Sequence, residues 1–167
     1  WRSNGLCLPP YRPRRKIRTG VKLDGLALRR NDVWAWDFVH DRYHDSEPLR
    51  CLTVKDEATG FCLAIKSDRN LQHKDVKMLL RELVTRYGRP RAIRSDNGSE
   101  LVAAALREEM EKQRIRLANI EPGKPWQNGS CESFNGTFRK ECLNAEVFNC
   151  LTEARVMIEK WRCRYNE

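Results

Sequence analysis

The first half of the chain alternates apolar side chains in a way that predicts three strands. In residues 31–40, three aromatic side chains on one face alternate with valine and alanine on the other, so both faces are apolar. Such a strand is typical of the centre of a sheet that is covered on both sides. Residues 49–54 and 60–65 predict two more strands, joined by a hairpin turn at 56–60. We expect these three strands to form an antiparallel meander.

Helical spacing of apolar residues begins after the predicted meander. Residues 73–87 repeat apolar side chains at i, i+3 and i+4, and the helix is expected to end at Gly88 and Pro90. A stripe of five apolar residues at alternating spacings of three and four predicts a final helix that contributes to the core or to an oligomer contact. The elements predicted after the first helix are a strand, a helix, a strand and this last helix, at residues 91–96, 100–113, 115–120 and 151–165.

One stretch between these elements changes from loop to helix. Three residues forbid regular structure at its start, Pro122, Gly123 and Pro125. After Gly129 the pattern becomes helical, with an apolar stripe made of Cys131, Phe134, Phe138 and Cys142. Another face of this helix aligns Glu132, Asn135 or Gly136, and Arg139. An acid is therefore expected in the first helical turn, directly after a rigid and basic loop.

Basic residues are concentrated at the start of the chain. Residues 1–30 hold nine lysines and arginines against one acid, so they carry +8 of the net charge of +9. With three prolines, they predict an extended arm or linker, the end of a preceding DNA-binding region, ahead of one domain at 31–167. Such an arm favours phosphate contacts, and the alternative is a solvated basic linker. The candidate DNA contacts in the arm are Arg12, Arg14, Arg15 and Lys16.

Cysteine use and hydropathy restrict the class of protein. The seven cysteines include no Cys-x-x-Cys pair, and with three histidines no zinc-finger spacing exists. No apolar run is long enough to span a bilayer, and no secretory signal opens the sequence. We expect reduced, mostly buried thiols in a cytoplasmic protein without membrane contact.

Three acids stand out for separate reasons. Asp37 lies within an apolar strand, where a carboxylate is costly unless it is hydrogen-bonded, paired or bound to a metal. Asp96 ends a predicted strand, although an Asx turn is the simpler interpretation of that residue alone. Glu132 lies in a first helical turn, where capping also favours an acid. The order strand, strand, helix allows all three carboxylates to meet at one end of a sheet and bind Mg²⁺. Asp56 is a rival carboxylate, for which turn chemistry is the simpler interpretation.

The spacing of the acids and the sequences around them resemble those of a known family. Asp96 and Glu132 are separated by 35 residues, as in the Asp-Asp-35-Glu signature of retroviral integrases and insertion-sequence transposases. From about Val33 onward, the chain resembles the integrase-core subunit of bacterial insertion-sequence transposases. The matching sequence motifs are Trp36-Asp-Phe38, Arg94-Ser-Asp-Asn-Gly-Ser-Glu100, Pro122-Gly-Lys-Pro-Trp-Gln-Asn-Gly129, Glu132-Ser-Phe-Asn-Gly-Thr-Phe-Arg139 and Trp161-Arg-Cys-Arg-Tyr-Asn166.

The resemblance implies an α/β, RNase H-like fold with a five-stranded mixed sheet flanked by helices. It implies that Asp37, Asp96 and Glu132 bind two Mg²⁺ ions, with Mn²⁺ as a substitute, and catalyse DNA 3′-end cleavage and strand transfer by in-line attack. It also implies that the partners are element ends and target DNA, that the chain forms a homo-oligomer on DNA, and that it is associated with the bacterial nucleoid.

DNA contacts are expected around the helix that carries Glu132. Lys124, Gln127 and Asn128 are expected to hold the DNA end, Trp126 to stack on a base, and Arg139 to bind a phosphate near the site. Asn135 is expected either to contact DNA or to support the metal ligands. Two alternatives stay open at this point. One is an RNase H-like nuclease that cuts without joining, and the other is an inactive DNA-binding or assembly module.

Overall fold

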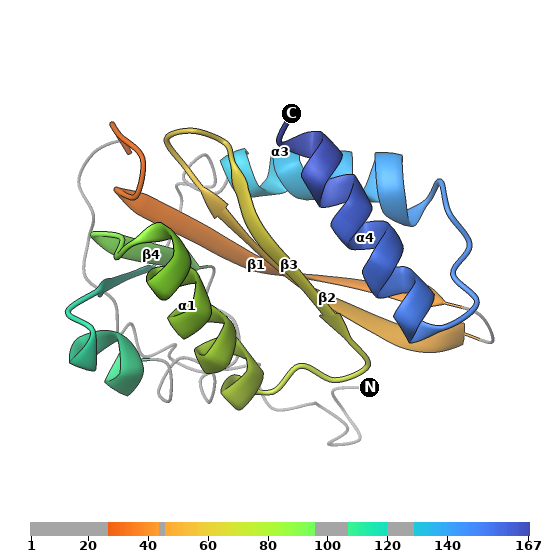
Figure 1. The fold of residues 1–167 in the computed structure, drawn as a ribbon, viewed down its shortest axis with the longest axis horizontal. Helices are drawn as coiled ribbons and strands as arrows, with labels where there is room; N and C mark the ends of the chain where they lie inside the picture. Colours follow the sequence, from red (N-terminus) through yellow and green to blue (C-terminus); the bar gives the residue numbers. More distant parts are fainter. Residues whose placement is uncertain (1–26, 44–45, 96–106, 120–128) are drawn as a thin grey trace, which may run out of the picture.

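A computed structural model describes residues 27–43, 46–95, 107–119 and 129–167. Its strands form one mixed sheet with the order β3-β2-β1-β4-β5 (Figure 1). The first three strands pair antiparallel, and β1-β4 and β4-β5 pair in parallel. The predicted meander is therefore confirmed. The strands are β1 Val33–Tyr43, β2 Glu47–Asp56, β3 Cys62–Asp68, β4 Ala92–Ser95 and β5 Arg116–Asn119.

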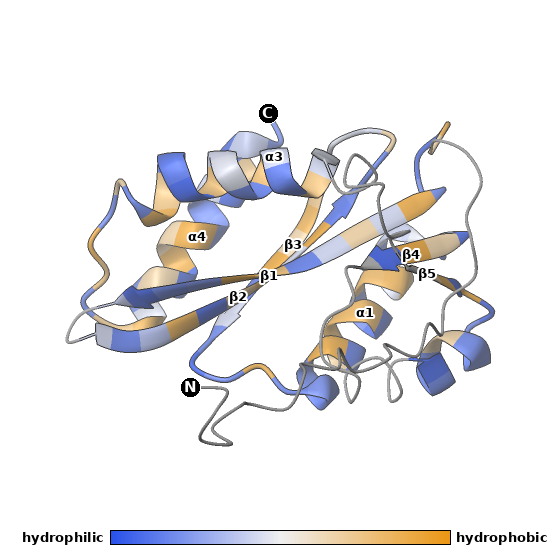
Figure 2. Ribbon diagram, turned by 180° about the vertical axis from the view of Figure 1, so that it is seen from behind, coloured by the Kyte–Doolittle hydropathy of each residue, from blue (hydrophilic) through white to orange (hydrophobic). Residues whose placement is uncertain are grey.

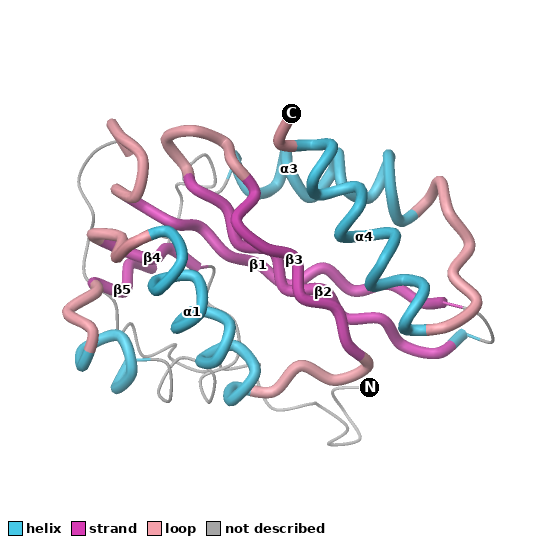
Figure 3. The backbone as a smooth tube through the Cα atoms, in the orientation of Figure 1, coloured by secondary structure: helices cyan, strands magenta, loops and turns pink. Residues whose placement is uncertain are grey.

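Helices cover both faces of this sheet. Figure 3 shows the strands as a diagonal layer, with α1 on one side and α3 and α4 on the other. The first helix has the predicted bounds, and Gly88 with a φ of 90° ends it. Residues 107–112 are also helical. The bounds of the labelled helices are α1 His73–Tyr87, α3 Gly129–Phe138 with its π-helical continuation η4 Arg139–Leu143, and α4 Leu151–Tyr165. No described helix has the length and apolar character needed to cross a membrane.

The central strand β1 contributes to two separate hydrophobic clusters. Trp34 and Trp36 pack with α1 on one face, while Val39 and Tyr43 pack with α3 and α4 on the other. Hydrophobic residues recur along β1, α1 and α4 in Figure 2. The expected central strand with two covered faces is therefore confirmed. Because Asp37 shares a face with Val39, the β1 carboxylate faces the layer that contains α3.

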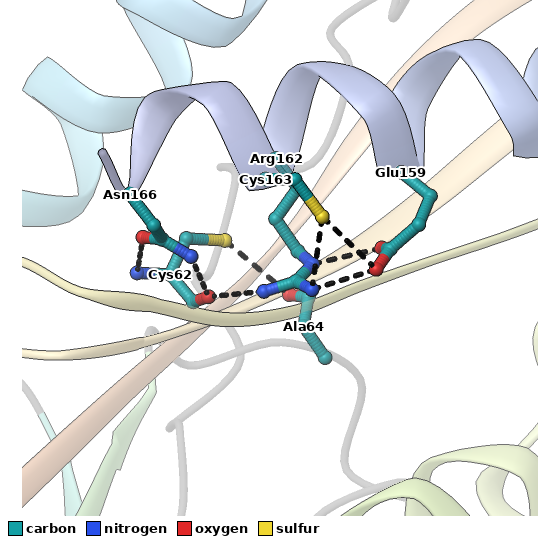
Figure 4. Close-up of polar contacts among 6 residues, drawn as sticks. All are labelled: Cys62, Ala64, Glu159, Arg162, Cys163 and Asn166. Carbon is teal, nitrogen blue, oxygen red and sulfur yellow. Dashed lines mark hydrogen bonds and ion pairs between the residues drawn. The ribbon is translucent and has the colours of Figure 1, made fainter.

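The edge strand β3 is covered by side chains from α4 and its C-cap. The Asn166 side chain accepts from the Cys62 backbone N–H at 2.8 Å and donates to the Cys62 carbonyl at 2.9 Å (Figure 4). The buried Arg162 also donates to that carbonyl, and its other nitrogens bind Glu159. At the far end of β3, Arg155 donates to the Ser67 carbonyl. These side chains pair backbone groups that would otherwise offer an edge to another chain.

Replacing Asn166 with alanine is expected to lower the free energy of unfolding by about 1–3 kcal/mol. The change removes two hydrogen bonds and leaves two backbone groups of Cys62 with fewer partners. Urea unfolding measures this difference, with exposed Asn144→Ala as the control. Equal stability of the two variants would contradict the role given to Asn166.

Candidate active site

Asp37 lies in the middle of β1 with its carboxylate held by hydrogen bonds. Its register partner across the sheet is Thr53 of β2. One carboxylate oxygen accepts from the Phe38 backbone N–H at 2.8 Å, and the other accepts from the Asn135 side-chain amide at 2.8 Å. These contacts reduce the cost of placing a charge within an apolar strand. They also orient the carboxylate toward α3, from which Asn135 projects.

Glu132 lies in the first turn of α3 and is exposed. Together with Asp37 it lines an open depression of about 350 Å³. The structure therefore brings two of the three acids to one surface feature, one from a strand and one from a helix. The residues lining the depression are Asp37, Phe38, Val39, Glu132, Asn135, Gly136 and Arg139.

Asp96 lies outside the described residues. The parallel ladder between β1 and β4 is described as far as the pair Trp36 and Ser95, which are the residues directly before Asp37 and Asp96. Lys124, Trp126, Gln127 and Asn128 also lie outside the described residues, as do the candidate contacts in the arm, Arg12, Arg14, Arg15 and Lys16.

Asn135 joins the acid on β1 to a neighbouring strand. The residue is 9% exposed. Its side-chain carbonyl oxygen lies 3.2 Å from the Thr53 hydroxyl, and that hydroxyl also lies 3.2 Å from the Asp37 backbone carbonyl oxygen. Thr53 is itself fully buried. The amide of Asn135 is thus engaged with the site in the described structure, whereas its contact with DNA stays a prediction. The sequence alone did not point to Thr53, because only the strand register places it beside Asp37.

Replacing Asn135 with leucine is expected to lower the free energy of unfolding by about 1.5–3 kcal/mol. Leucine has a similar size but removes the donor to the charged Asp37 carboxylate and the acceptor near Thr53. The difference is measured by urea unfolding beside Asn70→Leu, at an exposed loop position. A similar small effect of both changes would show that the contact with Asp37 does not stabilise the fold.

Arg139 lies at the edge of the same depression, two helical turns after Glu132. One guanidinium nitrogen donates to the His40 backbone carbonyl of β1 at 2.9 Å, while the side chain stays exposed. A cation is therefore anchored beside the two carboxylates, with further donors on its guanidinium group.

Asp56 does not belong to this site. The residue is 1% exposed, and its carboxylate accepts from the backbone N–H groups of Asn31, Ala58 and Thr59 and from the Thr59 hydroxyl. These bonds close the turn after β2, so the interpretation of Asp56 as turn chemistry is confirmed.

A buried ion pair lies close to the start of α3. Arg94 of β4 binds Glu57 at 3.0 Å, and both side chains are 9% exposed. Burial raises the pKa of Glu57, while the positive charges of Arg94 and Lys55 oppose that rise. The neighbouring Cys131 is also buried, and burial raises the pKa of its thiol to about 12. At neutral pH this thiol is protonated, which argues against a nucleophilic role in the first turn of α3.

The family of the chain follows from comparison with known proteins. Two family models, both described as "Integrase core domain", match residues 27–125 and 113–167. The chain belongs to the integrase core domain family. The integrase-core family that the acidic signature and the matching sequence segments predicted is thereby confirmed.

The curated relatives of this integrase core are proteins of bacterial insertion elements. An uncharacterized 39.2 kDa protein of insertion element IS476 from Xanthomonas euvesicatoria is 41% identical over 82% of this chain and 40% of its own length. An uncharacterized 31.7 kDa protein of insertion element IS407 from Burkholderia multivorans is 39% identical over 92% of this chain and 57% of its own length. The chain thus spans about half the length of these two relatives.

Solved structures share the fold at low sequence identity. The integrase catalytic core domain of HTLV-2, in complex with magnesium and in a dimeric form, has a TM-score of 0.62 at 20% identity over 83% of this chain and 88% of that one. The simian T-cell lymphotropic virus intasome in complex with the PP2A regulatory subunit B56 gamma has a TM-score of 0.63 at 18% identity, over 88% of this chain and 53% of that one. The expected RNase H-like fold, a mixed five-stranded sheet flanked by helices, is confirmed.

Proposed function

We propose that this chain is the catalytic core of a DNA transposase that cleaves DNA 3′ ends and joins them to target DNA. The observation that carries the proposal is the shared depression, in which Asp37 of β1 and Glu132 of α3 meet beside Arg139. These three residues match the acidic signature and the following basic residue of the family. The insertion-element relatives support a role in transposition.

The donor atoms of the depression fit a divalent metal site. Mg²⁺ prefers oxygen ligands and usually takes one or two carboxylates together with waters and phosphate oxygens. Among the residues that the structure describes, no group of three potential ligands is present. We assign Asp96 as the third ligand beside Asp37 and Glu132, because Trp36 and Ser95 pair across β1 and β4 and are followed directly by Asp37 and Asp96. The magnesium complex of the HTLV-2 core supports the choice of Mg²⁺, for which Mn²⁺ is a substitute.

In this proposal each described side chain has a separate task. Asp37 and Glu132, together with Asp96, would hold two divalent ions, and these would supply charge stabilisation for the entering and leaving oxygens of an in-line displacement at phosphorus. Asn135 keeps the Asp37 carboxylate in one orientation through its amide. Arg139, anchored at the His40 carbonyl, directs its remaining donors toward a DNA phosphate.

DNA contacts beyond the depression are part of the same proposal. We assign residues 1–30 as a basic arm that binds phosphates and residues 31–167 as the catalytic core. The entry loop before α3 holds the DNA end through Lys124, Gln127 and Asn128, and Trp126 stacks on a base. A homo-oligomer assembles on DNA, which is supported by the dimeric form and the intasome among the structural neighbours.

The proposed function is tested by incubating the chain with Mn²⁺ and a branched DNA that mimics a joined product. In the reverse of joining, the 3′-hydroxyl of the interrupted target strand attacks the phosphodiester at the branch, and the element strand leaves with a free 3′-hydroxyl. A transferase therefore yields a resealed target strand, which is longer than the input target fragments on a denaturing gel. Shortened strands without a resealed product would instead favour a nuclease. The absence of both products would contradict a self-sufficient catalytic core and favour a DNA-binding module.

A further inference from the structure

Lys55 is a buried lysine beneath the start of α3. It lies on β2 opposite Ala35, next to a register irregularity, and its side chain is directed at the helix that carries Glu132. Only 5% of the residue is exposed. Its ammonium group donates to the Ser130 backbone carbonyl at 3.1 Å and contacts the Ser130 hydroxyl at 3.0 Å.

The contacts of Lys55 differ from those of an ordinary buried cation. A buried ammonium group is costly unless it is paired, and such groups usually have a carboxylate partner. Within the described part of the chain, Lys55 forms no ion pair, and the nearby Glu57 is bound by Arg94. The Lys55 ammonium instead lies 5.5 Å from the centre of the Phe134 ring, a cation–π distance. The direct contacts of the Lys55 ammonium group in the described structure therefore go to the first turns of α3, although its charge also acts on the nearby Glu57.

A second attachment holds the same helix further along. Asn135 of α3 binds the Asp37 carboxylate and lies within hydrogen-bond distance of the Thr53 hydroxyl. Glu132 lies between the Ser130 and Asn135 attachments along the helix. Because a helix is stiff over one or two turns, two fixed points on either side determine how far Glu132 stands from β1.

The proposed metal site needs such a restraint. Two carboxylates at one site repel each other when no cation lies between them. First helical turns also lack part of their backbone hydrogen bonds and fray more easily than the helix interior. A contact that pulls the first turn of α3 toward β2 opposes both effects.

We infer that Lys55 is a positioning residue that fixes the first turn of α3 and so keeps Glu132 at the depression beside Asp37. The consequence of this placement for metal binding rests on the proposed function, whereas the fixing of the helix does not. This separation allows the two ideas to be tested with different measurements on the same variant.

The first measurement is amide hydrogen exchange of residues 129–138 in Lys55→Met. Methionine retains an unbranched chain but removes the charge and the donors to Ser130. We expect exchange in this segment to accelerate about tenfold or more, while α1 is unchanged. Lys66→Met is the matched control, because Lys66 is a partly buried lysine on the neighbouring strand β3. Unchanged exchange in residues 129–138 overturns the inference whatever the metal does.

The second measurement is Mn²⁺ affinity, followed by electron paramagnetic resonance. If the proposed site is real, wild type and Lys66→Met bind Mn²⁺ alike, and Lys55→Met binds at least about tenfold more weakly. Wild type that binds no Mn²⁺ overturns the proposed function, while the exchange result still decides the role of Lys55. Equal Mn²⁺ affinity of all three proteins overturns the inference that Lys55 keeps Glu132 in place for metal binding.

A second variant protects the test against a folding failure of Lys55→Met. Ser130→Ala removes only the hydroxyl at an exposed position and leaves the carbonyl contact with Lys55. A smaller acceleration confined to residues 129–138 is expected. If exchange in this variant equals that of wild type, and Lys55→Met does not fold, the inference that Lys55 fixes the first turn of α3 is rejected.

Discussion

Replacing Asp37 with asparagine is expected to abolish metal-dependent DNA joining, with a loss of at least about a hundredfold. The change removes one negative charge from the proposed ligand set. Divalent ions contribute several kcal/mol to the stabilisation of a phosphoryl transition state, and each 1.36 kcal/mol corresponds to a factor of ten in rate. Asparagine keeps the shape of the side chain and an oxygen that can accept from the Asn135 amide, so the fold is retained.

Single-turnover resealing of branched DNA measures this effect. Asp41→Asn is the matched control, because Asp41 lies four residues further along β1 on the same face and binds only its neighbouring backbone N–H among the described hydrogen bonds. We expect the control to stay within about twofold of wild type. Similar rates for the two variants would show that Asp37 has no special place in the reaction.

Replacing Phe138 with alanine is expected to lower the free energy of unfolding by about 3–5 kcal/mol. Phe138 is completely buried at the end of α3. Its ring centre lies 5.0 Å from that of Trp161 of α4 and 6.4 Å from that of Phe134. Truncation leaves a cavity between α3 and α4, and the large neighbouring rings cannot move enough to fill it.

The loss of Phe138 also affects the site, because the same packing holds α3 against the sheet. Thermal and urea unfolding measure the stability difference. Val156→Ala on α4 is the control, since Val156 is 63% exposed and surface changes usually stay within about 0.5 kcal/mol. A loss below about 1 kcal/mol for Phe138→Ala would contradict the central place of this ring.

Local patterns were sufficient for the helices and for the position of β1. The bounds of α1 were predicted correctly, because its apolar spacing is regular and Gly88 adopts the positive φ that ends it. The apolar stripe of α3 is buried as predicted, and the last helix contributes Ala154, Ile158 and Trp161 to the core. In these elements the local preference and the tertiary packing agree.

Strand ends were predicted less accurately because pairing determines them. β1 continues to Tyr43, and β2 spans Glu47–Asp56, since each strand extends wherever the other offers backbone partners. β3 begins at Cys62 and not at Gly60, because Gly60 has a φ of 75° and closes the turn with Asp56. The π-helical turn η4 was also not predicted, although it keeps Cys142 and Leu143 buried.

The candidate site shows the same division between local and tertiary information. Asp37 and Glu132 were named from sequence because a carboxylate in an apolar strand and an acid in a first helical turn are visible locally. The tasks of Thr53 and Lys55 depend on strand register and on the approach of α3 to β2, which the sequence does not display. The sequence signal for Lys55 was its position directly after the apolar run of the predicted strand at residues 49–54.

The most direct test of the proposed metal site is a Mn²⁺ titration of wild type, Asp37→Asn and Glu132→Gln, followed by electron paramagnetic resonance. We expect saturable binding by wild type and at least about tenfold weaker binding by each variant, because each loses one carboxylate ligand. Equal binding by all three proteins would contradict a metal site built on Asp37 and Glu132.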